Sequence, residues 1–265
     1  MVASAVDPSV GAAELLERGF VYLRAGPADK RAAWVLARDV FDAAAQVEPI
    51  ACAMPPLDVV GEFTIPPVGA LRRDFQALHI DFGVPIDACE AIDVARFTAL
   101  YVDRRQPPTT AFTRVVGLRA LLGQRRWPSR RALLARLRRY GATGHARSGY
   151  VEGILARLVE AADGGSALPA TADPGFLCGM EFGSMEEEHV HFARHGLRLD
   201  RVERRIALAP GDVLLFDNLA VAHGRVGRRR PEELHQLCVG HRGLDATAQR
   251  AVRDSVLDAF GAADE

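Results

Sequence analysis

Short apolar runs with the composition of β-strands recur along this chain of 265 residues. Clusters of glycine, proline and aspartate bound these runs, which is the pattern of strands joined by tight turns. At this length the chain could form one large β-rich domain or two small ones, and it is long enough to bury a core. The expected strands span residues 19–24, 75–82, 94–102, 109–116, 202–208, 213–216 and 234–239.

Helical spacing of apolar residues is found between and outside these strands. Ser184 and Glu187 have the spacing of a capping box, and Gly196 is a typical residue just after a helix end. Leucine and arginine at helical spacing within about 118–162 predict a helical insertion and not a second domain, because strands resume after it. We therefore expect a single α+β domain, mainly β, over residues 1–265. The expected helices outside the insertion span residues 11–18, 28–47, 184–196 and 245–260.

Composition argues against several classes of function. The 33 Lys and Arg residues nearly balance 34 Asp and Glu, so no overall attraction to nucleic acid or to an anionic membrane is expected. Arginines between residues 125 and 139 lie in an amphipathic pattern without interleaved aromatics, which favours a solvated helix face. The N-terminus has no basic leader before an apolar stretch, and the four cysteines are scattered without a C-x-x-C pair. These features predict a soluble, cytoplasmic protein.

Two strand-like segments carry side chains suited to a metal ion. His79 and Asp81 are two residues apart within the apolar run 77–83, so on a strand both would lie on the same face. His223 follows the apolar strand at 213–216. Two histidines and one carboxylate form the facial triad of non-haem Fe(II) enzymes, which leaves three coordination positions open. His79, Asp81 and His223 are therefore the candidate metal ligands and catalytic residues.

The spacing of His79 and Asp81 is weak evidence by itself. With 8 histidines and 34 acidic residues in 265 positions, about one His-x-Asp/Glu is expected by chance, and one is found. A hydrogen-bonded core histidine beside a turn aspartate is the ordinary alternative. The downstream segment decides between the two, because there a Pro-Gly-Asp turn and an apolar strand precede His223.

That downstream segment carries a resemblance to a known family. Residues 208–218, Leu-Ala-Pro-Gly-Asp-Val-Leu-Leu-Phe-Asp-Asn, followed by His223-Gly224-Arg225, resemble the distal-histidine segment of the Fe(II)/2-oxoglutarate-dependent oxygenases. The likeness is strongest to the taurine dioxygenase and clavaminate synthase-like branch. It implies a double-stranded β-helix core (jelly roll, cupin-like) with flanking and inserted helices. It also implies Fe(II) bound by His79, Asp81 and His223.

The resemblance implies a reaction as well. Fe(II), 2-oxoglutarate and O2 would hydroxylate or desaturate an unactivated C–H bond of a small molecule, with decarboxylation of 2-oxoglutarate to succinate. The implied substrate is a free amino acid or a specialised metabolite. Halogenating relatives lack the carboxylate of the triad, so the presence of Asp81 favours hydroxylation or desaturation over halogenation.

Residues for 2-oxoglutarate follow from the same resemblance. Thr109 or Thr110 lies where the family often has a threonine facing the co-substrate. The family's arginine, about ten to fifteen positions beyond the distal histidine, is absent, since His235 and Gln236 stand there. Arg225, two residues after the distal histidine and on the same strand face, is the favoured substitute. The other candidates are Arg242 and residues 228–230 of the arginine-rich hairpin.

The expected substrate contacts come from polar residues near these segments. The proline-rich connection at 49–67 directly precedes the strand of His79 and is expected to be a lid over the site. The sequence does not indicate an oligomeric state. Polar candidates for holding the substrate are Glu62, Asp74, Glu181 and Asp217.

Three other interpretations stay open. A cupin-like metal-binding or small-molecule-binding protein without oxidative turnover would keep the metal site but form no succinate. A non-haem iron oxygenase that does not use 2-oxoglutarate would consume O2 without it. His191 and His195, at i and i+4 of the helix expected at 184–196, form a competing pair of ligands, although a solvated capped helix is the ordinary explanation.

Overall fold

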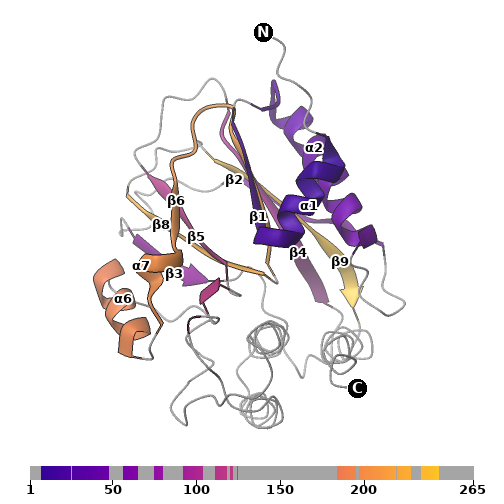
Figure 1. Ribbon diagram of the computed structural model, residues 1–265. Coiled ribbons are helices and arrows are strands. Elements are labelled where there is room, and N and C mark those ends of the chain that lie inside the picture. The colour runs from indigo at the N-terminus through magenta and orange to yellow at the C-terminus, as the bar shows by residue number, and fades with distance from the viewer. Residues whose placement is uncertain are drawn as a thin grey trace, which may run out of the picture.

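Two antiparallel β-sheets flanked by helices make up the described part of the protein (Figure 1). The chain is therefore mainly β with a few helices, as its sequence pattern predicts. The structure is a computed structural model. It describes residues 7–24, 26–47, 56–64, 75–79, 92–103, 111–117, 120–121, 124, 184–194, 197–218, 220–227 and 234–244.

The larger sheet has the strand order β1-β7-β4-β9-β2, and neighbouring strands in it are antiparallel. Two helices cover one of its faces (Figure 1). Its strands are β1 (Phe20–Leu23), β2 (Asp58–Thr64), β4 (Ile92–Tyr101), β7 (Val213–Asp217) and β9 (His235–Leu244), and the helices are α1 (Pro8–Arg18) and α2 (Lys30–Val47).

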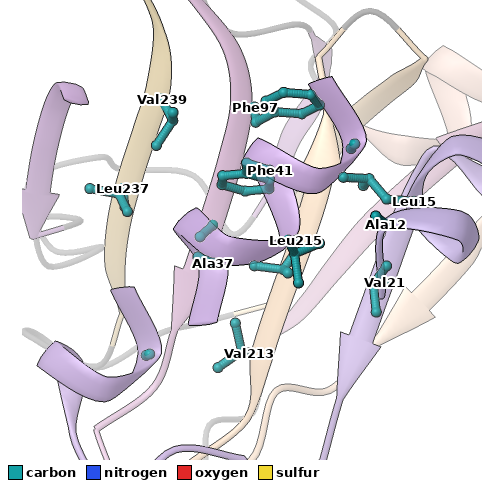
Figure 2. Close-up of a cluster of buried hydrophobic side chains, with 14 of the residues drawn as sticks. Ala12, Leu15, Val21, Ala37, Phe41, Phe97, Val213, Leu215, Leu237 and Val239 are labelled. Carbon is teal, nitrogen blue, oxygen red and sulfur yellow. The ribbon is translucent and has the colours of Figure 1, made fainter. Parts of the chain in front are cut away.

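The core between these helices and the larger sheet is aliphatic and aromatic (Figure 2). Phe41 of α2 stacks on Phe97 of β4 with ring centroids 4.8 Å apart and planes 7° from parallel. Leu215, Leu237 and Val239 lie on the same face and belong to the same buried cluster. Full burial of a side chain of this size stabilises the fold by about 1.5–3 kcal/mol relative to exposure. The helices are thus fixed to one face, and the other face of the sheet is left for the second sheet.

The smaller sheet has the order β3-β8-β5-β6. Val115 and Ile206 from its inner face pack in one buried cluster with Leu214 and Phe216 of the larger sheet, so the two sheets form a sandwich. Helices α6 and α7 contact its other face and edge. The elements are β3 (Phe75–His79), β5 (Phe112–Gly117), β6 (Arg204–Ile206), β8 (Val221–Val226), α6 (Met185–Arg194) and α7 (Leu199–Val202).

Local sequence signals account for the helix ends. Asp7 caps α1 by accepting a hydrogen bond from the Ser9 N–H at 2.9 Å. Gly19 ends that helix at φ 80°, where its N–H donates to the Leu15 carbonyl. The predicted capping box of α6 is confirmed in one direction, since Ser184 Oγ accepts from the Glu187 N–H at 3.2 Å.

One sequence prediction is wrong in this region of the fold, and one expected strand is present but shorter than predicted. Residues 58–64, expected within a lid, form strand β2, which pairs with β9 from Asp58 opposite Gly240 to Thr64 opposite His235. In the sequence, prolines stand before and after this strand and not within it, as is usual for proline near strands. The strand expected at 202–208 is shorter, because the Glu203 N–H donates to the Leu199 carbonyl and closes a helical turn before β6.

Several expected elements lie outside the described residues. They are most of the helical insertion at 118–162, the helix expected after residue 245, and the part of the His79 strand beyond residue 79. None of the helices in the described ranges has the length and apolarity needed to cross a membrane.

Candidate functional site

The two candidate histidines of the metal site lie directly opposite each other on neighbouring strands. β3 and β8 are antiparallel, and their register pairs His79 with His223. Residues directly opposite in an antiparallel pair lie on the same face of the sheet, with Cβ atoms about 4.5–5.5 Å apart. Segments 144 positions apart in the sequence are thus brought to one point of the smaller sheet.

His223 faces the space between the two sheets. Its ring centroid lies 4.5 Å from that of Phe216, which belongs to the larger sheet, and only 7% of the residue is exposed. Val115, opposite His223 on β5, is fully buried in the cluster that joins the sheets. His223 therefore lies on the inner face of the sandwich, and the register pairs the backbone of His79 with it.

Arg225 lies on the same inner face, two residues beyond His223. The register places it opposite Gln76 on β3 and opposite Thr113 on β5. Arg225 is 6% exposed and Thr113 is 2% exposed. The structure therefore puts a buried guanidinium and a buried threonine next to the pair of histidines.

Gly224 allows the strand of His79 to approach this closely. The register shifts by one residue between Gln76 and His79, which is a β-bulge in β3. A Cβ on Gly224 would lie 2.6 Å from the Gln76 carbonyl oxygen and 2.9 Å from the Ala77 carbonyl oxygen. Glycine is needed here because backbone atoms, which cannot turn aside as a side chain can, occupy that space.

Gly224→Ala is expected to move β3 away from β8 and to destabilise the protein by about 1–3 kcal/mol, since the added methyl group overlaps with backbone carbonyls. Urea denaturation of the variant measures the loss. Gly117→Ala is the control, because its nearest neighbour, the Arg18 carbonyl oxygen, would be at an ordinary contact distance of 3.7 Å. Equal stability of the Gly224 variant and wild type would contradict the close approach.

Three of the predicted cofactor or substrate residues lie away from the histidines. Glu62 on β2 is opposite Leu237, on the helix-covered face, and its Oε1 accepts from Lys30 Nζ of α2 at 2.6 Å. Arg242 is half exposed and pairs with Asp58 at 2.9 Å. Asp217 is buried, but the register places it opposite Phe97, whose ring faces α2. The structure does not bring these three together with His223.

The other predicted residues lie outside the described residues. Within the described part of the chain, no group of three His, Cys, Asp or Glu side chains could hold a metal ion. The carboxylate predicted to complete such a group belongs to Asp81, which is not among those residues. The same applies to Thr109, Thr110, Asp74 and Glu181, to residues 228–230, and to His195 of the competing histidine pair.

A polar group on the inner face of the larger sheet was not predicted from the sequence. Thr98 lies opposite Phe216 and is fully buried. Asn218 Nδ2 donates to Thr98 Oγ1 at 3.0 Å and to the Ala95 carbonyl at 3.4 Å. Thr98 Oγ1 also lies 3.8 Å from Cys238 Sγ. The signal in the sequence was the threonine between Phe97 and Ala99, inside a mostly apolar strand.

A buried ion cluster lies behind the histidines, on the outer face of the smaller sheet. Arg114 of β5 is fully buried, and its Nη2 lies 2.6 Å from Glu188 Oε2 and 2.6 Å from Glu203 Oε2. Glu203 also contacts His189 Nε2 at 3.0 Å and accepts from Arg205 Nε at 2.8 Å. Sequence reasoning missed this cluster, because arginine is seldom fully buried and its partners are distant in the sequence.

Within this ion cluster the pKa values of the two carboxylates shift in opposite directions. Burial raises the pKa of Glu188 above its ordinary value, and the charge of Arg114 offsets this only in part. Burial acts on Glu203 in the same direction, but hydrogen bonds from Arg114 and Arg205 outweigh it and lower the pKa of Glu203 to about 2. Glu203 is thus the carboxylate that stays ionised most firmly.

Glu203→Gln is expected to lower the free energy of unfolding by about 3 kcal/mol at pH 7. The pKa of Glu203 is depressed from 4.5 to about 2, so its contribution is present above pH 4.5 and is lost as the pH falls toward 2. The difference from wild type should therefore shrink between pH 7 and pH 3 in urea denaturation. Asp200→Asn is the exposed control and should change little at either pH. A difference that grows in acid would contradict this assignment.

Comparisons with known proteins place the chain in no family, and the solved structures that they find are only distantly similar to it. No protein-family model matches the chain, and no curated protein sequence matches it. The PvcB protein from Pseudomonas aeruginosa has a solved structure with 13% identity and a TM-score of 0.46, covering 89% of this chain and 82% of that chain. A second structure of PvcB, described as an Fe, alpha-ketoglutarate dependent oxygenase from an isonitrile synthetic pathway, has 16% identity and a TM-score of 0.45, with the same coverage. A Pseudomonas putida prolyl-4-hydroxylase has 11% identity and a TM-score of 0.34, covering 92% of this chain and 98% of that chain.

Proposed function

We propose that this protein is an Fe(II)- and 2-oxoglutarate-dependent oxygenase that hydroxylates or desaturates a C–H bond of a small molecule. The observation that carries the proposal is the register of β3 and β8, which pairs the backbone of His79 with that of His223, whose ring lies on the inner face of the sandwich. Asp81, two residues beyond His79, would supply the carboxylate of a facial triad. A free amino acid or a specialised metabolite is the proposed substrate class.

The strand orders support a double-stranded β-helix as the fold for this site. From β2 onward the chain alternates between the sheets except at the consecutive strands β5 and β6, with β2, β4, β7 and β9 in the larger sheet and β3, β5, β6 and β8 in the smaller one. Such alternation winds the chain into two facing sheets, as in a jelly roll. In this arrangement the candidate ligands come from the second and seventh of the eight strands, which lie side by side.

The donor set fits iron. Two imidazoles and a carboxylate suit Fe(II), and they leave open positions for a co-substrate. His223 is buried against Phe216, so its ring is oriented by packing and shielded from water. When bound, the metal would activate O2, the oxidant of the reaction, and 2-oxoglutarate would supply two electrons as it is converted to succinate and carbon dioxide. The protein's part is to hold these ligands on one face and to keep bulk water out.

Arg225 is the proposed partner of the distal 2-oxoglutarate carboxylate. A buried carboxylate is costly unless a cation and hydrogen bonds compensate it. Arg225 provides a guanidinium that is 6% exposed on the same face as His223, and Thr113 adds a buried hydroxyl beside it. Arg242 is engaged by Asp58 on the exposed edge of the larger sheet and is the weaker candidate.

Succinate formation tests the proposed function. Protein loaded with Fe(II) is incubated with 2-oxoglutarate, O2 and a panel of free amino acids, and succinate and oxygen consumption are measured. Succinate that requires Fe(II), O2 and the intact His223 supports the proposal. Metal binding without succinate would favour a cupin-like binding protein, and oxygen consumption without 2-oxoglutarate would favour another iron oxygenase.

Arg225→Met is expected to weaken 2-oxoglutarate binding to the metal-loaded protein by about thirtyfold or more, since loss of one partner from a buried charged pair costs about 2–5 kcal/mol. Calorimetric titration of the Co(II)-loaded protein with 2-oxoglutarate measures the change. The matched control is Arg242→Met, which removes a guanidinium from the exposed edge and should leave the affinity unchanged. The reverse ranking of the two variants would transfer the role to Arg242.

A further inference from the structure

A side chain of helix α6 contacts the strand of His79. Glu188 lies on α6 and is fully buried. Its Oε1 accepts a hydrogen bond from the Leu78 N–H at 2.7 Å. Leu78 directly precedes His79, so this contact fixes the peptide next to the candidate metal ligand.

The β-bulge explains why a side chain is needed at this position. Four residues of β3, from Gln76 to His79, lie opposite three residues of β8, from Arg225 to His223. The extra residue breaks the regular ladder, and amide groups at a bulge must find other acceptors. The Leu78 N–H donates to the Glu188 carboxylate, which stands in for a strand carbonyl.

Arg114 holds that carboxylate in place. Glu188 Oε2 lies 2.6 Å from Arg114 Nη2, while Oε1 is directed to Leu78. Arg114 belongs to β5, and its neighbour Val115 is opposite His223. Strand β8, which carries His223, lies between β3 and β5. Glu188 therefore contacts both neighbours of β8, through Arg114 on β5 and through the Leu78 N–H on β3. The cation also lies over the ring of Phe75, 5.3 Å from its centroid, near the start of β3.

We propose that Glu188 is a positioning residue that sets the place of the metal ligand His79 by binding the Leu78 N–H at the β-bulge. The inference rests on the proposed function for the identity of the bound metal. It assigns to α6 a role in the metal site, although α6 lies on the opposite face of the sheet from His223. A residue on the outer face of the smaller sheet would thus position a metal ligand of the same sheet.

Two matched substitutions separate positioning from stability. Glu188→Gln and Glu203→Gln each remove one of the two carboxylate charges that contact Arg114. Of the two glutamates, Glu188 is the one that also accepts a hydrogen bond from β3. A glutamine has one acceptor oxygen in place of two, and the charge of Arg114 attracts it. In Glu188→Gln the amide NH2 group would then face the Leu78 N–H, donor against donor, and the contact with β3 would be lost.

The test uses two measurements on the full chain. Co(II) titration by calorimetry should give a dissociation constant about 10–100-fold higher for Glu188→Gln and nearly unchanged for Glu203→Gln, since such outer contacts contribute on this scale. Amide exchange at Leu78, followed by NMR with 15N-leucine labelling, should accelerate in Glu188→Gln alone. If Glu188→Gln does not fold, Glu188→Asp keeps the charge for Arg114 while shortening the reach to Leu78.

Equal effects of the two substitutions on both measurements would overturn the proposal, because Glu188 would then act only through general stability. Accelerated exchange with unchanged Co(II) affinity would overturn the link to the metal site. A wild-type protein that binds no Co(II) would overturn the proposed function and with it the metal role. Exchange at Leu78 would then still decide whether Glu188 holds β3.

Discussion

Replacing His223 by alanine is expected to remove metal binding and, with it, all succinate formation. The substitution deletes one of three proposed ligands. Changes to residues that only contact a ligand lower metal affinity by about 10–100-fold, so loss of the ligand itself should lower the affinity by about 10²-fold or more. The ring is also packed against Phe216, so the variant loses buried contacts and some stability. Calorimetric titration with Co(II) measures the affinity, and urea denaturation measures the stability separately.

His241 offers the matched control for this experiment. It is also 7% exposed, but it lies on β9 of the larger sheet, on the same side of that strand as Val239 and Leu237, which face the helices. His241→Ala should therefore cost stability while leaving Co(II) affinity unchanged. A His223 variant that binds Co(II) as tightly as wild type would remove the basis for the iron site.

The candidate residues on the inner face of the smaller sheet were easier to predict from the sequence than the ion cluster on its outer face. The Pro210-Gly211-Asp212 turn is a local signal, and it is present: Gly211 has φ 90°, and Asp212 Oδ2 accepts from the Ala209 N–H at 2.8 Å. That turn sets the start of β7 and, through it, the position of His223. Local chemistry was enough here because the turn and the strand are adjacent in the sequence.

Features that depend on distant contacts were not predictable in the same way. Strand β2 has mixed polar and apolar residues, and its identity comes from pairing with β9, far along the chain. The bulge in β3 shows itself only in the register against β8. Sequence alone placed Glu62 near the site, whereas its contact with Lys30 on α2 assigns it to the other face of the larger sheet.

Arg114→Met is expected to lower the free energy of unfolding by about 3–5 kcal/mol, because it leaves the Glu188 and Glu203 carboxylates buried without their shared cation. Urea denaturation at pH 7 measures the loss. Arg205→Met is the control, since Arg205 pairs with the same Glu203 but is nearly half exposed, and it should cost less than about 1 kcal/mol. Similar losses for both variants would mean that burial of the cation matters little.

A triple variant separates the two roles of the ion cluster. Arg114→Met combined with Glu188→Leu and Glu203→Leu removes all three charges, so no uncompensated carboxylate remains buried, and most of the stability lost in Arg114→Met should return. In the triple variant the Leu78 N–H would have lost its acceptor, because the side chain that replaces Glu188 is apolar. A triple variant with stability near wild type but weak Co(II) binding would therefore show that the ion cluster positions the metal site and does not act through stability alone. Recovery of both together would instead make metal binding a simple consequence of a stable fold.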